Sequence, residues 1–358
     1  MKKIVLTGGG TAGHVTPNIA LLPALQAAGY EIAYVGSYEG IEKKLIADFN
    51  IPYTGISTGK FRRYLDSKNF SDPFRVMKGF VEARNYLKNY QPDVVFSKGG
   101  FVSVPVVRAA ASLHIPCIIH ESDMTPGLAN KLCIPVAEKV CCNFPETMKN
   151  IPADKAVLTG SPIRAELAEG SKLAGLNMCG FTANKPVIMV IGGSLGAANV
   201  NKAVRDALPK LLEDFQVVHL CGKDKIDNLL LNTPGYKQFE YIKAELKDIF
   251  AMADVVISRA GANAICELLA LKKPNILIPL PAASSRGDQL LNAASFEAQG
   301  YSIVLNEDDI TTNLLVDKVH ELYFNRQNYV DAMSKSHQMD AVKTIMELIN
   351  EAADKKTN

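Results

Sequence analysis

Two segments with the same pattern, about half the chain apart, constrain the fold most strongly. Residues 2–14 read KKIVLTGGGTAGH, and residues 185–197 read KPVIMVIGGSLGA. In each segment a short apolar run leads into a glycine-rich loop, and a helical pattern follows. This order is typical of a buried parallel strand that turns tightly into a helix. We therefore predict two α/β domains in series.

More strand candidates support a parallel sheet in each half of the chain. Helical patterns lie between most of them, and this alternation requires right-handed crossovers. The apolar runs are 31–35, 94–97, 117–120 and 139–142 in the first half, and 217–220, 255–258 and 275–279 in the second. We predict two Rossmann-like domains that face each other across a cleft.

The limits of these domains follow from the segments between the runs. We expect the first domain to cover residues 1–163 and the second to cover 164–336. The segment that continues through Gly180 has no clear long period, so we expect it to join the domains. From about Ala332 the sequence predicts a helix that ends in a polar tail.

Composition limits the class of protein. Hydrophobic residues make up 47% and charged residues 21%, which is typical of a folded protein. The formal charge of +2 gives no general attraction to nucleic acid, so we expect no such partner.

The N-terminus lacks the apolar stretch of roughly 7–15 residues of a signal peptide. No apolar run approaches the ~20 residues of a spanning helix. We expect a soluble, intracellular protein.

The seven cysteines do not form a recognisable metal or disulfide pattern. Their number is odd, and no C-x-x-C pair occurs among them. We expect reduced, mostly buried thiols.

Glycine-rich loops are the main candidates for ligand binding. Glycine lets the backbone approach a ligand, and the helix N-terminus that follows presents free N–H groups to a pyrophosphate. The chain has three such loops and a fourth strand–helix turn: GGGTAGH (8–14), SKGGFVS (97–103), GGSLGA (192–197) and SRAGANAICE (258–267).

A dinucleotide-binding dehydrogenase is one alternative for the first loop. Gly8, Gly10 and Gly13 fit the G-x-G-x-x-G pattern. However, Glu39 lies later than the carboxylate that usually binds the ribose, and His14 directly after the last glycine is unusual for nicotinamide binding. The pattern alone is therefore a weak indication.

Residues 258–292 are the most informative stretch. The pattern predicts a strand, a short turn, a helix and another strand, with Glu267 in the second turn of the helix. A carboxylate there can accept two hydrogen bonds from a ribose diol. Gln289 and Asn292 follow on the next helix and are suited to sugar hydroxyls. The alternative is that Glu267 and Gln289 are ordinary surface residues.

Several motifs together resemble one known family. They occur in a single order: GGGTAGH, FSKGGFVSVP, HESDMTPGLANK, GSPIR, GGSLGA and SRAGANAICE with RGDQLLNA. This set resembles the MurG family, and the resemblance covers nearly the whole chain. Two departures are visible: Ala12 stands where the family generally has glycine, and HESD, which contains Asp123, replaces the commoner His-Glu-Gln-Asn.

The resemblance implies a fold and an activity. It implies the GT-B glycosyltransferase fold, with the donor mainly on the second domain and a C-terminal helix, residues 337–358, that packs on the first. The implied reaction transfers N-acetylglucosamine from UDP-N-acetylglucosamine to lipid I and forms lipid II in peptidoglycan synthesis. It also implies contacts to substrate from Thr11, Ala12, Gly13, His14, Asn130, Arg164, Ser194, Ile242, Ala262, Asn263, Ala264, Ile265, Cys266, Glu267 and Gln289.

Such an inverting transfer needs a base for the acceptor hydroxyl and a way to stabilise the leaving diphosphate. Neutral imidazole is available near neutral pH, so we hypothesise that His14 is the base, with Glu121 as the rival. Helix N-termini near Ser194 and Ala262, together with Arg164, could meet the charge on the departing UDP. We expect no metal and no cofactor, because no Asp-x-Asp motif lies beside a strand end.

An undecaprenyl-linked acceptor requires contact with a membrane. Apolar and basic residues at helical spacing predict an interfacial helix over residues 74–90. The apolar residues are Phe74, Met77, Phe80 and Val81, and the basic ones are Arg75, Lys78, Arg84 and Lys88, preceded by Lys60, Arg62 and Arg63. The alternative is an ordinary amphipathic helix on the domain core. We expect a peripheral protein on the anionic cytoplasmic face of the cell membrane, and the resemblance suggests contact with other cell-wall enzymes.

Three other functions stay open at this point. They are another GT-B lipid glycosyltransferase, a UDP-sugar epimerase, and a nucleotide-sugar-binding protein without catalysis. The presence of both His14 and Glu121 disfavours the last of these.

Overall fold

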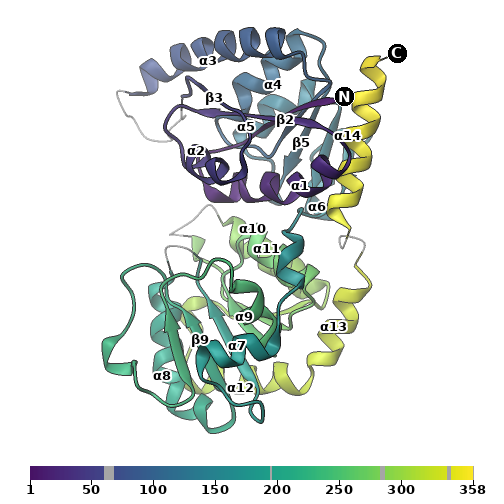
Figure 1. The fold of residues 1–358 in the computed structure, drawn as a ribbon. Helices are drawn as coiled ribbons and strands as arrows, with labels where there is room; N and C mark the ends of the chain where they lie inside the picture. The colour runs from purple at the N-terminus through teal and green to yellow at the C-terminus, as the bar shows by residue number, and fades with distance from the viewer. Residues whose placement is uncertain (60–67, 194–195, 283–286, 337–339, 358) are drawn as a thin grey trace. The chain divides into compact units, whose positions relative to one another are not determined.

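The computed structural model divides into two compact units. Unit 1 consists of Met1–Arg164 and Asp340–Asn358, and unit 2 of Ala165–Met339. The structure describes residues 1–59, 68–193, 196–282, 287–336 and 340–357. Each unit is an α/β structure around one parallel sheet, which confirms the predicted fold class (Figure 1).

The sheet of unit 1 has seven strands in the order β3-β2-β1-β4-β5-β6-β7, and every neighbouring pair is parallel. The central strands are apolar and buried on both faces, which is typical of a parallel sheet covered by helices. The strands are β1 (Lys3–Thr7), β2 (Glu31–Ser37), β3 (Tyr53–Ile56), β4 (Val94–Ser97), β5 (Cys117–Glu121), β6 (Lys139–Cys142) and β7 (Ala156–Leu158).

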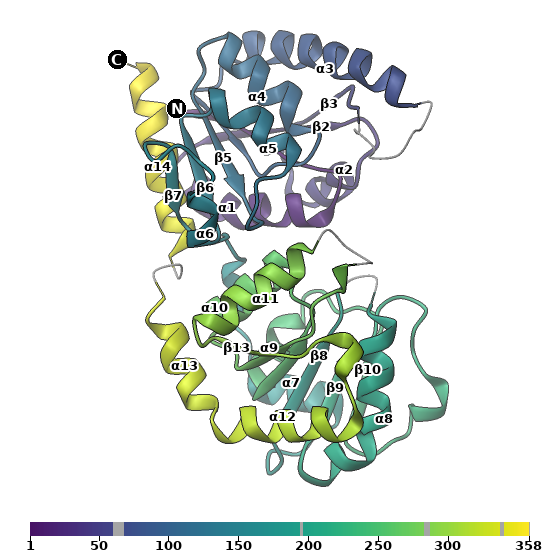
Figure 2. The ribbon, with the colours of Figure 1, turned by 180° about the vertical axis from the view of Figure 1, so that it is seen from behind.

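Helices cover both faces of this sheet (Figures 1 and 2). Successive side chains of a strand point to opposite faces. Accordingly, Ile4 and Leu6 pack with α1 and α14, and Val5 packs with α3 and α4. The helices of unit 1 are α1 (Thr16–Ala27), α2 (Ile41–Ile46), α3 (Lys68–Tyr90), α4 (Ser103–Ser112), α5 (Leu128–Cys133), α6 (Pro145–Met148) and α14 (Ala341–Thr357).

The last helix, α14, belongs to the core of unit 1 although it is the end of the chain. Ile345 and Ile349 are fully buried in the cluster that contains Ile4 and Leu6. The Tyr30 hydroxyl donates to Asn350 Oδ1 at 2.8 Å, and Lys2 forms an ion pair with Asp354 at 2.6 Å. The prediction of one helix from about Ala332 is wrong, because α13 ends at Ser334 and α14 begins at Ala341.

Unit 2 repeats the architecture with six parallel strands in the order β10-β9-β8-β11-β12-β13. Its strands are β8 (Val187–Ile191), β9 (Gln216–Leu220), β10 (Tyr236–Phe239), β11 (Val255–Ser258), β12 (Asn275–Leu277) and β13 (Ser302–Val304). Its helices are α7 (Lys172–Cys179), α8 (Ala198–Asp214), α9 (Leu246–Met252), α10 (Ala262–Ala270), α11 (Asp288–Ala298), α12 (Thr312–Phe324) and α13 (Arg326–Ser334).

The segment that was expected to join the domains contains a helix of unit 2. Ser171 caps α7 by accepting a hydrogen bond from Ala174 N, and Gly180 ends it in the left-handed conformation. Gly175 of α7 lies so close to α9 that a Cβ would be 2.4 Å from the carbonyl oxygen of Asp248. The linker interpretation of this segment is therefore wrong, because close packing on α9 stabilises a short helix that has little periodicity of its own.

Two further features bear on the sequence-based predictions. No helix within the described ranges is long and apolar enough to cross a membrane. All seven cysteines are buried and free, and burial raises the pKa of thiols such as Cys133, to about 12. The expectation of reduced, buried thiols is confirmed.

Candidate active site

In each unit, polar residues gather where the direction of strand order reverses. Ligands of open parallel sheets bind at such points, beyond the carboxyl ends of the strands. In unit 1 the reversal lies between β1 and β4, which are followed by residues 8–14 and 98–102. In unit 2 it lies between β8 and β11, which are followed by residues 192–197 and 259–261.

The first glycine loop is held closely against its surroundings. Tyr34 donates its hydroxyl hydrogen to the Gly8 carbonyl at 2.7 Å, and Asn18 Nδ2 donates to Thr7 O at 3.1 Å. A Cβ on Gly8 would lie 2.5 Å from the carbonyl oxygen of His14. Only glycine fits this position, so the loop brings His14 next to the end of β1.

His14 lies in a single 3-10 turn, Ala12–His14, just before α1. Its Nδ1 is 2.9 Å from Thr11 Oγ1, and its ring also hydrogen-bonds the Gly9 backbone. Burial, followed by the positive charge of Lys98, lowers the pKa of His14 to about 4, although Gly9 and Glu42 act in the opposite direction. The imidazole is therefore neutral near pH 7 and can accept a proton.

The carboxylate of Glu121, the alternative base, already accepts hydrogen bonds from three neighbouring groups. It is 4% exposed, and its carboxylate accepts hydrogen bonds from Asp123 N at 2.9 Å, Gly127 N at 3.0 Å and Asn130 Nδ2 at 2.8 Å. These donors shape the segment between β5 and α5, so the carboxylate is suited to holding this loop.

Among the predicted substrate contacts, Asn130 has a buried polar atom that forms no hydrogen bond with the described residues. Its Nδ2 donates to His120 O at 3.1 Å and to Glu121. Its Oδ1 is buried and finds no hydrogen-bond donor among the described residues. The atom lies close to Gly99, on which a Cβ would approach it to 3.3 Å. This orphaned acceptor is a position that a hydroxyl or amide of a ligand could fill.

Sequence reasoning missed two buried charged residues beside these loops, Glu42 and Lys98. Glu42 Oε2 accepts from Gly10 N at 3.1 Å, and Lys98 Nζ is 2.9 Å from His120 Nδ1. Glu42 lies in none of the motifs, Lys98 lies in SKGGFVS without a pattern that shows its partner, and each meets a partner more than 20 positions away. The glycines around Glu42 are the one signal in the sequence that could have pointed to it.

In unit 2, the N-terminus of α10 follows β11 after a three-residue turn. No side chain of the described residues caps it at Gly261, and a helix N-terminus is a place where N–H groups can bind an anion. Ala262, Asn263 and Ala264 form its first turn, and Glu267 lies in the second. The side chains of Ile265 and Cys266 are buried.

The turn before α10 is braced by side chains from other elements. Arg259 donates to Ile278 O at 3.1 Å and Pro279 O at 3.2 Å, and it pairs with the half-buried Glu307. Asn292, predicted to contact a sugar, is buried and donates to Ala260 O at 3.1 Å. This bond holds the turn, and the buried Oδ1 of Asn292 finds no donor among the described residues, so its contact with a sugar stays a prediction.

Two other predicted residues of unit 2, Ile242 and Gln289, follow β10 and β12. Gln289 is in the first turn of α11, where its Oε1 accepts a hydrogen bond from Leu280 N at 3.0 Å. Ile242 follows β10 and is buried. Ser194 lies outside the described residues, and Arg164 is the last residue of the first segment of unit 1.

Comparison with known proteins decides the family. Two family descriptions match the chain: the glycosyltransferase family 28 N-terminal domain over residues 4–142 and the glycosyltransferase family 28 C-terminal domain over residues 187–349. A relative from Lachnospira eligens is 65% identical over 351 residues, which is 98% of this chain and 99% of the relative. Its name is UDP-N-acetylglucosamine–N-acetylmuramyl-(pentapeptide) pyrophosphoryl-undecaprenol N-acetylglucosamine transferase.

Two solved structures are also similar. The crystal structure of MurG from Acinetobacter baumannii has a TM-score of 0.77 and 29% identity, and the match covers 98% of this chain and 100% of that one. The chain belongs to the MurG family of glycosyltransferases. A UDP-GlcNAc 2-epimerase from Neisseria meningitidis, solved with UDP-GlcNAc, has a TM-score of 0.69 and 14% identity over 98% of this chain and 100% of that one. The second likeness shows the fold alone.

Because the chain belongs to the MurG family, the dehydrogenase alternative is wrong. The geometry of the first loop agrees, because the buried Glu42 carboxylate takes the Gly10 N–H group that a pyrophosphate would need. Among the described residues, no group of three or more His, Cys, Asp or Glu side chains is arranged to hold a metal ion.

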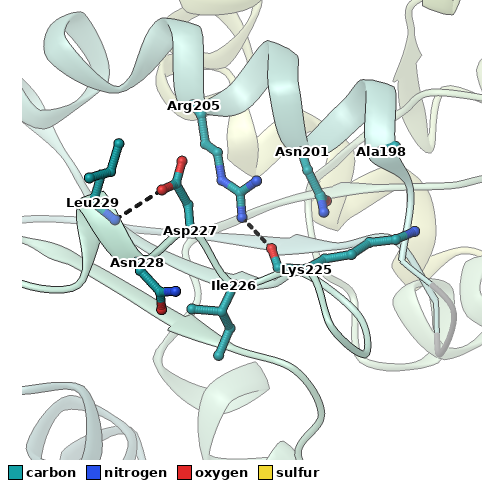
Figure 3. Close-up of a pocket in the computed structure, with 8 residues that line it drawn as sticks. All are labelled: Ala198, Asn201, Arg205, Lys225, Ile226, Asp227, Asn228 and Leu229. Carbon is teal, nitrogen blue, oxygen red and sulfur yellow. Dashed lines mark hydrogen bonds between the residues drawn. The ribbon is translucent and has the colours of Figure 1, made fainter.

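A pocket of about 480 Å³ lies beside the glycine loop after β8 of this MurG-family chain (Figure 3). Arg205 of α8 donates to Lys225 O at 2.6 Å and to Gln238 Oε1 at 2.9 Å. Lys225 Nζ in turn donates to Gly196 O at 3.2 Å. These polar groups brace the loop after β8.

The outer surface of α3 carries the residues predicted to meet a membrane. Phe74, Met77 and Val81 are 74%, 67% and 55% exposed, so the interpretation of α3 as an ordinary core-facing helix is wrong for these three. Phe80 instead packs partly against the core of unit 1. A groove of about 590 Å³ between α3 and α4 is lined by Val76, Met77, Lys78, Phe80, Val81, Val104, Pro105 and Arg108. Arg75 is exposed, and Lys60, Arg62 and Arg63 lie outside the described residues.

Proposed function

We propose that this chain transfers N-acetylglucosamine from UDP-N-acetylglucosamine to lipid I and so forms lipid II. The observation that carries this proposal is the 65% identity, over 98% of the chain, to a transferase whose name states that donor and that acceptor. The reaction makes the chain an N-acetylglucosaminyltransferase of peptidoglycan synthesis.

Within this proposal, His14 is the general base. The acceptor hydroxyl oxygen attacks the anomeric carbon of the donor while the bond from that carbon to the phosphate oxygen of UDP breaks. The hydroxyl proton passes to the imidazole, and UDP leaves with the electron pair. His14 is supported by its partly accessible position on the loop after β1, whereas the oxygens of Glu121 already accept three hydrogen bonds.

The donor is assigned to unit 2. The uncapped N-terminus of α10 can stabilise negative charge on the diphosphate as the bond to the sugar breaks. Glu267 is then in reach of the ribose hydroxyls from the second turn of the same helix. Contacts from Thr11, Ala12, Gly13, Asn130, Arg164, Ser194, Ile242 and Gln289 remain part of the proposal.

The acceptor is delivered from a membrane surface on which the protein is peripheral. Exposed apolar side chains on α3 favour insertion among lipid chains, and Lys78 and Arg108 beside the groove favour anionic headgroups. This feature supports attachment to the cytoplasmic face of the cell membrane. Contact with other cell-wall enzymes stays an expectation from the family.

A donor-specificity assay tests the reaction. The purified chain is incubated with a short-chain lipid I analogue and either UDP-N-acetylglucosamine, UDP-N-acetylgalactosamine or UDP-glucose, and the glycosylated lipid is measured. We expect product with UDP-N-acetylglucosamine at a rate at least ten times that with the other donors. Product from a diacylglycerol acceptor instead, or interconversion of the donor without transfer, would support another lipid glycosyltransferase or an epimerase.

A further inference from the structure

Two buried charged side chains contact the first glycine loop, and the proposed chemistry uses neither. Glu42 on α2 is 0% exposed, and Lys98 directly after β4 is 1% exposed. Removing a charge from water costs several kcal/mol unless other groups compensate for it. Both residues are therefore held by specific partners, and these partners connect them to the loop that carries His14.

Glu42 fits into a space that glycine residues leave open. Its Oε1 accepts hydrogen bonds from Ser37 N at 2.9 Å and Ser37 Oγ at 2.5 Å, and its Oε2 accepts from Gly10 N. A Cβ on Gly9 would lie 2.5 Å from the Glu42 carboxyl carbon. The carboxylate thus fixes the loop to the end of β2, four residues before His14.

Lys98 is fixed from the other neighbouring strand. Its ammonium group can only donate, so His120 Nδ1 accepts its hydrogen bond at 2.9 Å, and Ser122 Oγ is its second partner. His120 is therefore neutral, and its Nε2–H donates to Gly160 O at 2.9 Å. A Cβ on Gly8 would lie 3.3 Å from the Lys98 Cβ, so this side chain lies directly against the loop.

We propose that Glu42 and Lys98 are positioning residues for the transfer reaction, which hold the loop that carries His14 and set the charge around its imidazole. The proposal rests on the function above, in which His14 accepts the proton of the acceptor. Other charged groups near His14 are few among the described residues. Helix α1 contains no charged side chain, and Lys43 and Lys44 of α2 are exposed.

The two residues act in opposite directions. The negative charge of Glu42 favours the protonated imidazole, and the positive charge of Lys98 favours the neutral one. Removing Lys98 should therefore make His14 easier to protonate, and removing Glu42 should make it harder. A purely structural role would produce no such pair of opposite effects.

The test is an NMR titration of the His14 imidazole in the full chain, with Lys98→Met, Glu42→Gln and the exposed control Lys43→Met. His14→Gln assigns the resonance. We expect Lys98→Met to raise the pKa of His14 from about 4 by about one unit or more, and Glu42→Gln to lower it. Lys43→Met should leave it unchanged. The pH at which kcat/KM falls on the acid side should shift in the same direction as the pKa of His14 in each variant.

Wild-type pKa values in both folded variants would overturn the proposal. If Glu42→Gln does not fold, Lys98→Met decides alone, since the absence of an upward shift contradicts the assignment. The titration needs no turnover. A wild-type chain that titrates as expected but transfers no sugar would therefore contradict the proposed function and leave the electrostatic assignment supported.

Discussion

At the scale of single residues, His14 is set apart from the other histidines by what surrounds it. Two other histidines, His120 and His219, are fully buried, and both of their ring nitrogens have partners within the fold. His114 is exposed, on a backbone with a φ of 56°. His14 lies between these extremes, partly accessible on a loop that the fold holds in place.

The first prediction concerns the catalytic role of His14. We expect His14→Ala to lower kcat by about 10²–10⁴-fold, because that is the usual contribution of a general base. Donor affinity, measured by calorimetry with UDP-N-acetylglucosamine, should stay within a factor of a few. The control is His114→Asn, since asparagine tolerates a positive φ. A His14→Ala enzyme with nearly normal kcat would return Glu121 to consideration.

The residues that sequence reasoning missed share one property. Glu42, Lys98 and Arg259 act through partners that the chain brings close only by folding, for example Gly10 for Glu42 and Glu307 for Arg259. A motif search finds residues that stand together in the sequence, such as Thr11 to His14. Glu42 lies in none of the motifs, and Lys98 and Arg259 lie in SKGGFVS and SRAGANAICE, whose sequence does not show what these side chains contact. Their partners became visible only in the structure.

At the scale of elements, the sequence predicted the central strands and missed the edge strands. β4, β6 and β11 begin and end where the apolar runs did, because strands buried on both faces need uninterrupted apolar residues. The four missed strands, β3, β7, β10 and β13, are the outermost strands of the two sheets. They are three or four residues long, and β10 reads YKQF with an exposed lysine, so neither length nor pattern identified them.

The second prediction belongs to the surface of α3. We expect Phe74→Ser combined with Met77→Ser to reduce sedimentation with anionic vesicles at least tenfold, because these exposed side chains would otherwise insert among lipid chains. The melting temperature and UDP-sugar affinity should not change, since neither side chain fills the core. Phe324→Ser is the matched control, because Phe324 on α12 is also 74% exposed. Equal vesicle binding by both variants would leave α3 without a membrane role.

The third prediction concerns α14. Ile349 is fully buried against the sheet of unit 1, so we expect Ile349→Ala to lower the free energy of unfolding of that unit by about 2–5 kcal/mol. The neighbouring exposed Glu351→Ala should change it by about 0.5 kcal/mol or less. Urea titration of both variants checks this. A similar loss in the two would mean that α14 contributes little to the core.

At the scale of the whole molecule, buried neutral histidines lower the free energy of unfolding as the pH falls. Burial, followed by the charge of Arg205, lowers the pKa of His219 to about 3. The unfolded chain has an ordinary histidine pKa near ~6.5, so below that pH it binds a proton that the folded chain does not. The stability contributed by a neutral His219 is therefore present above about pH 6.5 and is lost as the pH falls toward 3.

The fourth prediction follows from the direction in which this lowered pKa changes stability with pH. Between pH 6 and 4 each such histidine should lower the free energy of unfolding by up to about 1.4 kcal/mol per pH unit. His219→Gln should reduce the slope for unit 2, because a glutamine can keep hydrogen bonds to Tyr236 and Asn201 without titrating. His114→Asn is the exposed control. Urea unfolding at several pH values measures the slope, and an unchanged slope in His219→Gln would contradict the assignment.

The position of α14 affects the order in which the two units fold during synthesis on the ribosome. Synthesis runs from the N-terminus, yet the hydrophobic core of unit 1 includes Ile345 and Ile349 near the C-terminus. Unit 2, which ends at Met339, emerges with all of its own residues earlier. The half that is made first is therefore the half that finishes folding last, and until α14 emerges one face of its sheet stays exposed.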